Sequence, residues 1–305
     1  MTTIELTALE GTNPIGVLAA LGVLDALDGA GRPARLCWTE DLVPTARIDG
    51  VHDLDDLVAC LVTDRDHEVH DIVLGEDLVD LKPSPADLAS WADRVAAIND
   101  LAVARRFSSL VAEGALAGTG ESKPTHLHFT AGQQRFVSMV RELRGAVTHL
   151  HLRAALVGPW LYASGVPSMG WDNRGERIYA LRAGNPSKEK RPSAPGVEWL
   201  AWTGLGHVPV AHAGASALRT AGCDGSWKAS AWRWVLWADP LPAAVVWAVM
   251  DDPLIVGERT VHDDAARRKL QARGVTAVLE APIRRTDQGG YGSFGPANFL
   301  ADLSS

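Results

Sequence analysis

Residues 10–27 read EGTNPIGVLAALGVLDAL and contain the longest strongly apolar run of the chain. Asn13 is typical of a helix N-cap, and Pro14 fits the first helical position, where its missing N–H leaves no hydrogen bond unmade. From there to Leu27 apolar residues lie on nearly all sides of a helix, which is typical of a helix inside a core. Residues 3–9 alternate between polar and apolar and predict a strand. We therefore expect a strand followed by a buried helix.

The rest of the chain mixes short strands with helices. Alternating apolar residues predict strands at residues 35–39, 44–48, 71–74 and 125–129. Capping residues and helical periodicity predict helices at residues 53–62, 84–98, 100–116, 132–147 and 149–157. From residue 160 onward, where nine of the eleven tryptophans lie, strand-like runs at 179–182, 218–223 and 230–236 alternate with helical runs at 196–202, 242–250 and 263–273. We predict an α+β fold of mixed helices and short antiparallel strands, Trp-rich in its C-terminal half.

The composition is that of a globular protein, with 47% hydrophobic and 22% charged residues in a chain of 305. The best candidate for an internal boundary is the stretch 118–124, which contains glycine and proline. It separates an acidic α+β region, residues 1–120, from a basic, Trp-rich α+β region, residues 121–305, unless the two form one continuous domain. Three scattered cysteines fit neither a disulfide framework nor a zinc knuckle. Residues 15–24 are too short for a membrane span and follow no basic residue, so we expect a cytoplasmic location.

Charge is distributed unevenly along the chain. Residues 1–100 hold 6 Lys and Arg against 20 Asp and Glu, a net charge of −14, whereas residues 101–305 hold 23 against 17, a net charge of +6. An acidic surface repels a phosphate backbone, so only the second part is expected to contact nucleic acid. Its basic residues cluster on one face of the helix 132–147 and its continuation, in a loop rich in Asn, Pro and Ser, and before the aromatic, glycine-rich stretch 289–295. The candidate nucleic-acid-binding residues are Arg135, Arg141, Arg144, Arg153, Lys188, Lys190, Arg191, Arg284 and Arg285, with a solvated surface as the alternative.

The sequence has no recognisable catalytic motif. It contains neither a G-x-S-x-G nucleophile elbow nor a dinucleotide fingerprint, and residues 11–16 lack the Lys and Ser or Thr that follow a phosphate-binding loop. We therefore assign no catalytic residue and no cofactor. One alternative is a metal-dependent hydrolase using His126 and His128, which would share one face of the strand expected at 125–129. Another is a protein-interaction module whose acidic first third docks on a basic partner.

Four segments occur in an order found in one known family. They are the N-P-x-G-containing helix at 10–22, the Gln-Phe-containing helix start at 132–137, the stretch from Trp171-Asp172 to Tyr179-Ala180-Leu181-Arg182, and the Trp-containing strand with its Pro-Leu continuation at 234–241. Together they resemble CRISPR type I-G (formerly I-U) effector proteins, of the helicase–nuclease-extension and large-subunit-like groups, over nearly the whole chain. The resemblance implies a non-catalytic subunit of a crRNA-guided, Cascade-like complex in antiviral defence, which binds crRNA or target DNA and neighbouring subunits. Residues 289–294 lack the Lys and Arg that this family tends to carry between its closing aromatics.

Overall fold

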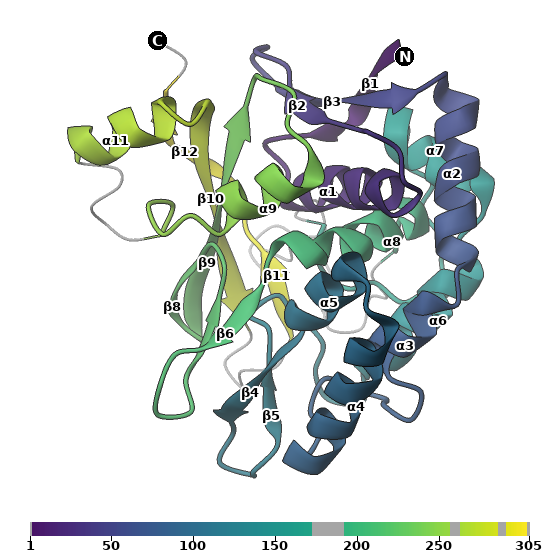
Figure 1. Ribbon diagram of the computed structural model, residues 1–305, viewed down its shortest axis with the longest axis vertical. Helices are drawn as coiled ribbons and strands as arrows, with labels where there is room; N and C mark the ends of the chain where they lie inside the picture. Colours follow the sequence, from purple (N-terminus) through teal and green to yellow (C-terminus); the bar gives the residue numbers. More distant parts are fainter. Residues whose placement is uncertain (1, 173–191, 257–262, 286–290, 304–305) are drawn as a thin grey trace, which may run out of the picture.

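The computed structural model describes residues 2–172, 192–256, 263–285 and 291–303. Its fold is α+β, as predicted, with helices packed beside small antiparallel sheets (Figure 1). One sheet has the order β1-β3-β2 and consists of β1 (Thr2–Glu10), β3 (Thr45–Val51) and β2 (Leu36–Trp38). The other has the order β11-β10-β9-β8, with β12 also paired to β10, and consists of β8 (Cys223–Ser226), β9 (Ala229–Trp237), β10 (Val275–Arg285), β11 (Gly292–Phe294) and β12 (Asn298–Asp302). Two hairpins are separate from these sheets, β4 (Val111–Leu116) with β5 (Ser122–Pro124) and β6 (Val210–His212) with β7 (Leu218–Thr220).

The helices surround a central pair. This pair consists of α1 (Pro14–Gly29) and α8 (Pro195–Gly204), which is continued by the 3-10 turn η4 (Leu205–His207). The remaining helices are α2 (Leu54–Asp66), α3 (Val69–Leu74), α4 (Pro85–Ile98), α5 (Leu101–Ser108), α6 (Phe136–Ala146), α7 (His149–Val157), α9 (Ala243–Met250) and α11 (Asp264–Gln271). No helix in the described part of the chain is long and apolar enough to cross a membrane.

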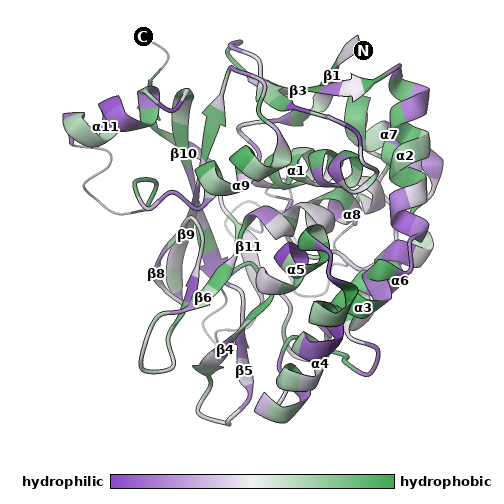
Figure 2. Cartoon of the chain, in the orientation of Figure 1, coloured by the Kyte–Doolittle hydropathy of each residue, from purple (hydrophilic) through white to green (hydrophobic). Residues whose placement is uncertain are grey.

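The buried helix predicted after the first strand is confirmed as α1. Every residue from Pro14 to Leu27 is buried. Figure 2 shows α1 to be hydrophobic along most of its length, whereas α2 and α4 alternate between hydrophobic and hydrophilic faces. Asn13 precedes the helix in an extended conformation, as an N-cap residue does, but its side chain makes no capping hydrogen bond.

Two glycines allow α1 and α8 to cross in backbone contact. A Cβ atom added to Gly22 would lie 1.9 Å from the carbonyl oxygen of Leu200. A Cβ atom added to Gly204 would lie 1.9 Å from the carbonyl oxygen of Leu18. Because real Cβ atoms do not come this close to an oxygen, any other residue at either position would push the two helices apart.

Polar contacts also join the two parts of the chain across the predicted boundary at residues 118–124. On α1, Asp25 is buried and its Oδ1 lies 2.8 Å from Nε2 of His207, which is also buried. The indole N–H of Trp234 donates to the carbonyl oxygen of Gly11 at 2.9 Å. The boundary stretch itself forms most of the turn and the second strand of the β4–β5 hairpin. The division into residues 1–120 and 121–305 stays a prediction.

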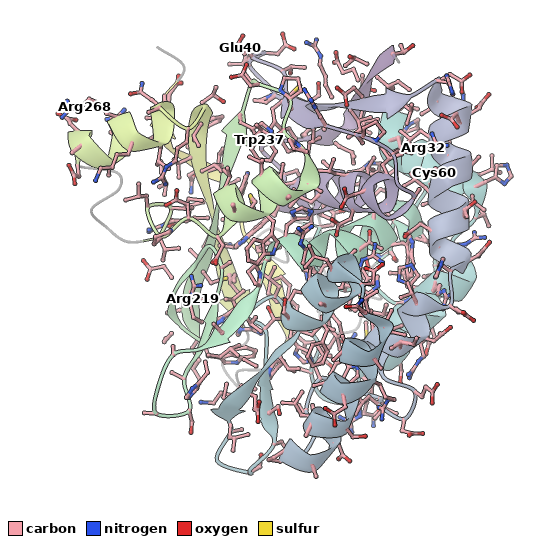
Figure 3. All side chains as sticks on the ribbon, viewed as in Figure 1. Arg32, Glu40, Cys60, Arg219, Trp237 and Arg268 are labelled. Carbon is pink, nitrogen blue, oxygen red and sulfur yellow. The ribbon has the colours of Figure 1, made fainter. Side chains whose placement is uncertain are left out.

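Tryptophans of β9 form part of the core. The rings of Trp232 and Trp234 stack with their centroids 5.0 Å apart, and both side chains are fully buried. Trp237 donates its indole N–H to the carbonyl oxygen of Leu36 at 2.7 Å, which links β9 to the first sheet. Figure 3 shows Trp237 in the interior, whereas Arg268 lies at the outer end of α11. Trp237 therefore links the two sheets, while Trp232 and Trp234 fill the core beside it.

Most of the predicted elements that fall within the described residues are confirmed. The confirmed strands at 35–39, 44–48 and 230–236 correspond to β2, β3 and β9, and the run at 218–223 contains β7. The confirmed helices at 53–62, 84–98, 149–157, 196–202, 242–250 and 263–273 correspond to α2, α4, α7, α8, α9 and α11. The strand expected at 179–182 lies outside the described residues.

Two predictions in the first half of the chain are wrong. Residues 71–74 belong to α3 instead of a strand, because their buried positions recur at helical spacing. The helix expected at 100–116 ends at Ser108, and β4 follows. The hydroxyls of Ser108 and Ser109 donate to carbonyl oxygens of the last turn of α5, an arrangement that competes with continuation of the helix.

The strand expected at 125–129 is also wrong. This segment is an irregular, buried turn between β5 and α6. The carbonyl oxygens of His126 and His128 accept hydrogen bonds from the guanidinium of Arg285, at 2.7 Å and 3.0 Å. Because a side chain supplies these donors, the segment needs no neighbouring strand.

We expect Gly22→Ala to lower the free energy of unfolding by about 3 kcal/mol, because the added Cβ atom would collide with α8. Gly29→Ala, in the same helix, is the matched control, since a Cβ atom there meets nothing within 4 Å. Urea denaturation of both variants measures the difference. Equal stabilities would contradict a backbone contact between α1 and α8.

Candidate nucleic-acid interface

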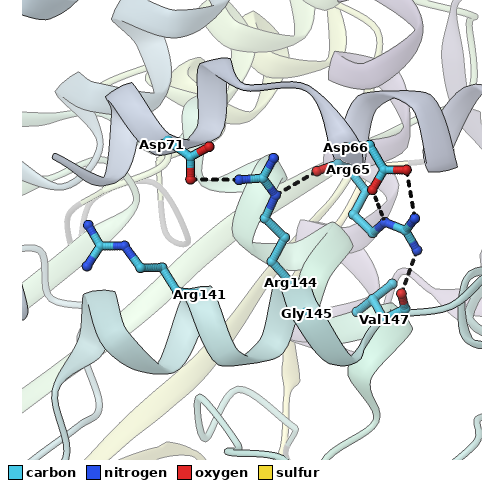
Figure 4. A pocket seen from close by; sticks show the side chains of 7 residues that line it. All are labelled: Arg65, Asp66, Asp71, Arg141, Arg144, Gly145 and Val147. Carbon is cyan, nitrogen blue, oxygen red and sulfur yellow. Dashed lines mark hydrogen bonds and ion pairs between the residues drawn. The ribbon is translucent and has the colours of Figure 1, made fainter. Parts of the chain in front are cut away.

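The helix expected at 132–147 is confirmed as α6, although it begins at Phe136. Its apolar face is buried, as predicted. The opposite face, on which Arg141 and Arg144 lie, does not face open solvent. It packs against the end of α2 and against α3 (Figure 4). The basic face of α6 is therefore partly covered by the acidic region of the same chain.

Backbone carbonyls hold the two arginines in place. Arg141 donates to the carbonyl oxygens of Leu78 at 2.6 Å and Gly75 at 2.7 Å. Arg144 donates to the carbonyl oxygen of Arg65 at 2.8 Å and to Oδ1 of Asp71, also at 2.8 Å. These bonds fix the positions of both guanidinium groups.

The same residues surround a pocket of about 430 Å³ between α6 and the α2–α3 segment. We call it the arginine pocket, and its lining consists of Arg65, Asp66, Asp71, Arg141, Arg144, Gly145 and Val147 (Figure 4). Its volume falls in the range of small-ligand sites, roughly 300–1,000 Å³. The sequence indicated only Arg141 and Arg144, because the other charged residues, Arg65, Asp66 and Asp71, come from the acidic first region.

Arg135 and Arg153 are more accessible. The side chain of Arg135 is 53% exposed, with Nη1 3.7 Å from Oδ2 of Asp80. The side chain of Arg153 is 45% exposed and pairs with Asp55. The Arg153–Asp55 pair is exposed on both sides, and exposed ion pairs contribute little to stability, so Arg153 can exchange its partner for another anion. Arg135 is exposed as well, but its partner Asp80 is buried.

The remaining predicted contacts fall into two groups. Lys188, Lys190 and Arg191 lie outside the described residues. Arg284 and Arg285 end β10, and Arg284 is exposed there.

Arg285 is mostly buried and has a structural role. Besides the two histidine carbonyls it donates to the carbonyl oxygen of Trp227 at 3.0 Å, and its guanidinium lies 3.7 Å from the centre of the Trp227 ring. Burial lowers the pKa of Arg285 to about 10, so it stays cationic at neutral pH. The two aromatics of the stretch 289–295 that the structure describes differ in exposure. Tyr291 is 45% exposed, whereas Phe294 is fully buried.

The rings of His126 and His128 contact different partners. Nδ1 of His126 lies 2.9 Å from Oγ1 of Thr220, and burial together with the nearby Arg285 lowers the pKa of His126 to about 4. Nε2 of His128 lies 3.0 Å from Oδ1 of Asp80. Within the described ranges, no group of three or more His, Cys, Asp or Glu residues could hold a metal ion. The geometry therefore gives the hydrolase alternative no support.

Asp80, which the sequence did not single out, anchors the start of α6. Its Oδ1 accepts hydrogen bonds from the backbone N–H of Phe136 at 3.2 Å and of Leu81 at 3.0 Å, in addition to the contact with His128. Burial is the largest influence and opposes the charged form, but the contact with His128 and the backbone N–H groups of Phe136 and Leu81 together outweigh it, so the pKa of Asp80 is lowered. Asp80 thus stands in for the missing N-cap side chain of α6 and positions the arginine pocket.

Glu198 is a second buried carboxyl that the sequence analysis missed. It accepts hydrogen bonds from the hydroxyl of Ser168 at 2.8 Å and from the backbone N–H of Met169 at 2.7 Å. Burial raises its pKa to about 7, and the charge of Asp172 acts in the same direction. A single carboxylate within the apolar run 195–202 was the signal that could have revealed it.

We expect Asp80→Ala to lower the free energy of unfolding by about 3 kcal/mol, because it leaves the N–H groups of Leu81 and Phe136 without their acceptor and removes the contact with His128. Asp80→Asn retains one oxygen and should cost less. Asp71→Ala is the control, since the side chain of Asp71 is 56% exposed and its ion pair is worth about 1 kcal/mol or less. Urea denaturation measures all three. Equal losses for the two alanine variants would show that Asp80 does not anchor α6.

Glu198 is expected to make stability depend on pH. Its pKa is raised from 4.5 to about 7 by folding, so between these values the folded state holds a proton that the unfolded state releases. Its contribution is complete below pH 4.5, declines as the pH rises from 4.5 to about 7, and is lost above that, by about 3 kcal/mol in total. Glu198→Gln should flatten this part of the profile in unfolding experiments between pH 4.5 and 8. An unchanged slope would contradict a protonated Glu198.

Comparison of the chain with protein-family models and with curated proteins finds no match. The resemblance to CRISPR type I-G effector proteins therefore stays a prediction, carried by the four segments of the sequence that suggested it.

Proposed function

We propose that this protein is a non-catalytic subunit of a crRNA-guided, Cascade-like type I CRISPR effector complex, which acts in the cytoplasm in antiviral defence. It binds crRNA or target DNA and neighbouring subunits. The observation that carries this function is the order of the four family-like segments, which extend from residue 10 to residue 241.

The described parts of these segments have a common structural role, which supports the resemblance. The first forms α1, where a Cβ atom on Gly16 would lie 2.7 Å from the carbonyl oxygen of Glu10. The second leads into α6 through Phe136, and the fourth contains the end of β9, including Trp234. All three contribute to one core cluster. Motifs of this kind specify packing and are what distant members of one family would share.

The expected mode of binding is contact with the phosphate backbone. In crRNA-guided complexes base pairing reads the sequence, while the protein holds the duplex or single strand through charge and shape. The residues suited to this are Arg135 and Arg153 on the exposed surface and Arg141 in the arginine pocket. Lys188, Lys190 and Arg191 remain candidates from the sequence.

Co-purification tests this function directly. Tagged protein is expressed together with the products of its chromosomal neighbours, purified, and the retained nucleic acid is sequenced. We expect one discrete small RNA and several partner subunits. Recovery of the protein alone, without nucleic acid, would contradict the function. Partner subunits without RNA would instead favour the interaction module.

A matched pair of variants tests the surface contact. Arg153→Ala should reduce the RNA retained per mole of protein, because it removes a candidate phosphate contact. Arg219→Ala is the control, since its side chain is 44% exposed and is paired with Asp251, much as Arg153 is paired with Asp55. Equal RNA recovery from the two variants would exclude Arg153 from the interface.

A further inference from the structure

The arginine pocket carries an excess of positive charge. Three guanidinium groups and two carboxylates line it. Arg65 is paired with Asp66 through two hydrogen bonds of 2.8 Å, and Arg144 is paired with Asp71. Two of the three cations are thereby neutralised, and the lining keeps a net charge of about +1.

The unneutralised charge belongs to Arg141. Its three hydrogen bonds go to the backbone carbonyl oxygens of Gly75, Glu76 and Leu78, which accept N–H groups but carry no net charge. Among the described residues it has no carboxylate partner within ion-pair distance. An arginine has five N–H donors, so two of those on Arg141 remain for a ligand.

The donors of the pocket are fixed before any ligand arrives. Arg65 also donates to the carbonyl oxygen of Val147, and Arg144 donates to those of Arg65 and His67 at 2.8 Å and 2.9 Å. Because these side chains are already held in place, binding a ligand costs less conformational entropy than it would if the side chains first had to be ordered. Planar guanidinium groups match the oxygens of a phosphate group, and charge-assisted hydrogen bonds of this kind are strong.

We propose that the arginine pocket binds one phosphate group, with Arg141 as the principal contact and with Arg65 and Arg144 beside it. A phosphodiester of a nucleic-acid backbone carries one negative charge, which matches the net charge of the lining. This site rests on the function proposed above and assigns it a specific point of contact. The aspartates of the lining limit the affinity, because each also repels the ligand.

Two substitutions should change the affinity in opposite directions. Asp71→Asn retains an oxygen for Arg144 but removes a negative charge, so it should tighten phosphate binding about fivefold. Arg141→Met should weaken binding about tenfold. Asp251→Asn is the control, because Asp251 also pairs with an arginine, Arg219, but does not line the pocket. Asp71→Asn keeps the test valid if Arg141→Met proves unstable.

The probes are inorganic phosphate, measured by calorimetry, and a 20-nucleotide single-stranded RNA without terminal phosphates, measured by fluorescence anisotropy. If both substitutions shift RNA affinity, the ligand is a backbone phosphodiester. If they shift only the affinity for inorganic phosphate, the pocket takes a free phosphate. If neither substitution changes the affinity for either probe, the proposed phosphate site is wrong.

The outcomes also separate the site from the function. If crRNA co-purifies but Asp71→Asn and Arg141→Met leave the RNA affinity unchanged, the proposed phosphate site is wrong and the proposed function stands. If both substitutions change phosphate binding but neither RNA nor partner subunits co-purify, the proposed function is wrong and the phosphate site stands.

Discussion

The backbones of α1 and α8 touch at the centre of the molecule, and the positions of the other elements follow from this contact. Gly22 and Gly204 each remove the side chain that would separate the helices. Around the crossing, β1 leads into α1, and η4 continues α8 to bring His207 against Asp25. A buried acid paired with a buried histidine is costly to separate, since either group alone would lose its partner without regaining water. The crossing is therefore fixed both by shape and by this pair.

Much of the fold could be predicted from the sequence wherever a local rule and the tertiary environment agree. Ser84 caps α4, accepting a hydrogen bond from the backbone N–H of Asp87, as the sequence suggested. The unusually apolar run after Asn13 could only be stable inside a core. The errors occur where short apolar runs fit both a helix and a strand, as at residues 71–74. At residues 125–129 the deciding group is a guanidinium about 160 residues away, which no local pattern reveals.

The candidate site could be predicted only in part, for a related reason. The sequence identified the arginines of α6 but not their acceptors, which are carbonyl oxygens more than 60 residues earlier in the chain. The two parts of the chain do differ in net charge, but some of these charges pair with each other inside the protein, as Arg144 does with Asp71. A basic helix face is therefore a poor guide to accessible charge until its neighbours are known. Arg141 is informative because its partners are carbonyls, which leave its charge available.

The crossing of α1 and α8 also has a consequence for synthesis of the protein on the ribosome. Gly22 and Gly204 are about 180 residues apart, so at roughly 5–20 residues per second α1 leaves the ribosome about 10 to 35 seconds before its partner exists. During that time the side of α1 that packs on α8 is uncovered, although β1, β3 and α2, which cover other sides, are already made. Nascent chains of this protein are thus natural clients for chaperones that bind exposed apolar segments. Chains that terminate before residue 195 would keep the α8-facing side of α1 uncovered and would be prone to aggregate.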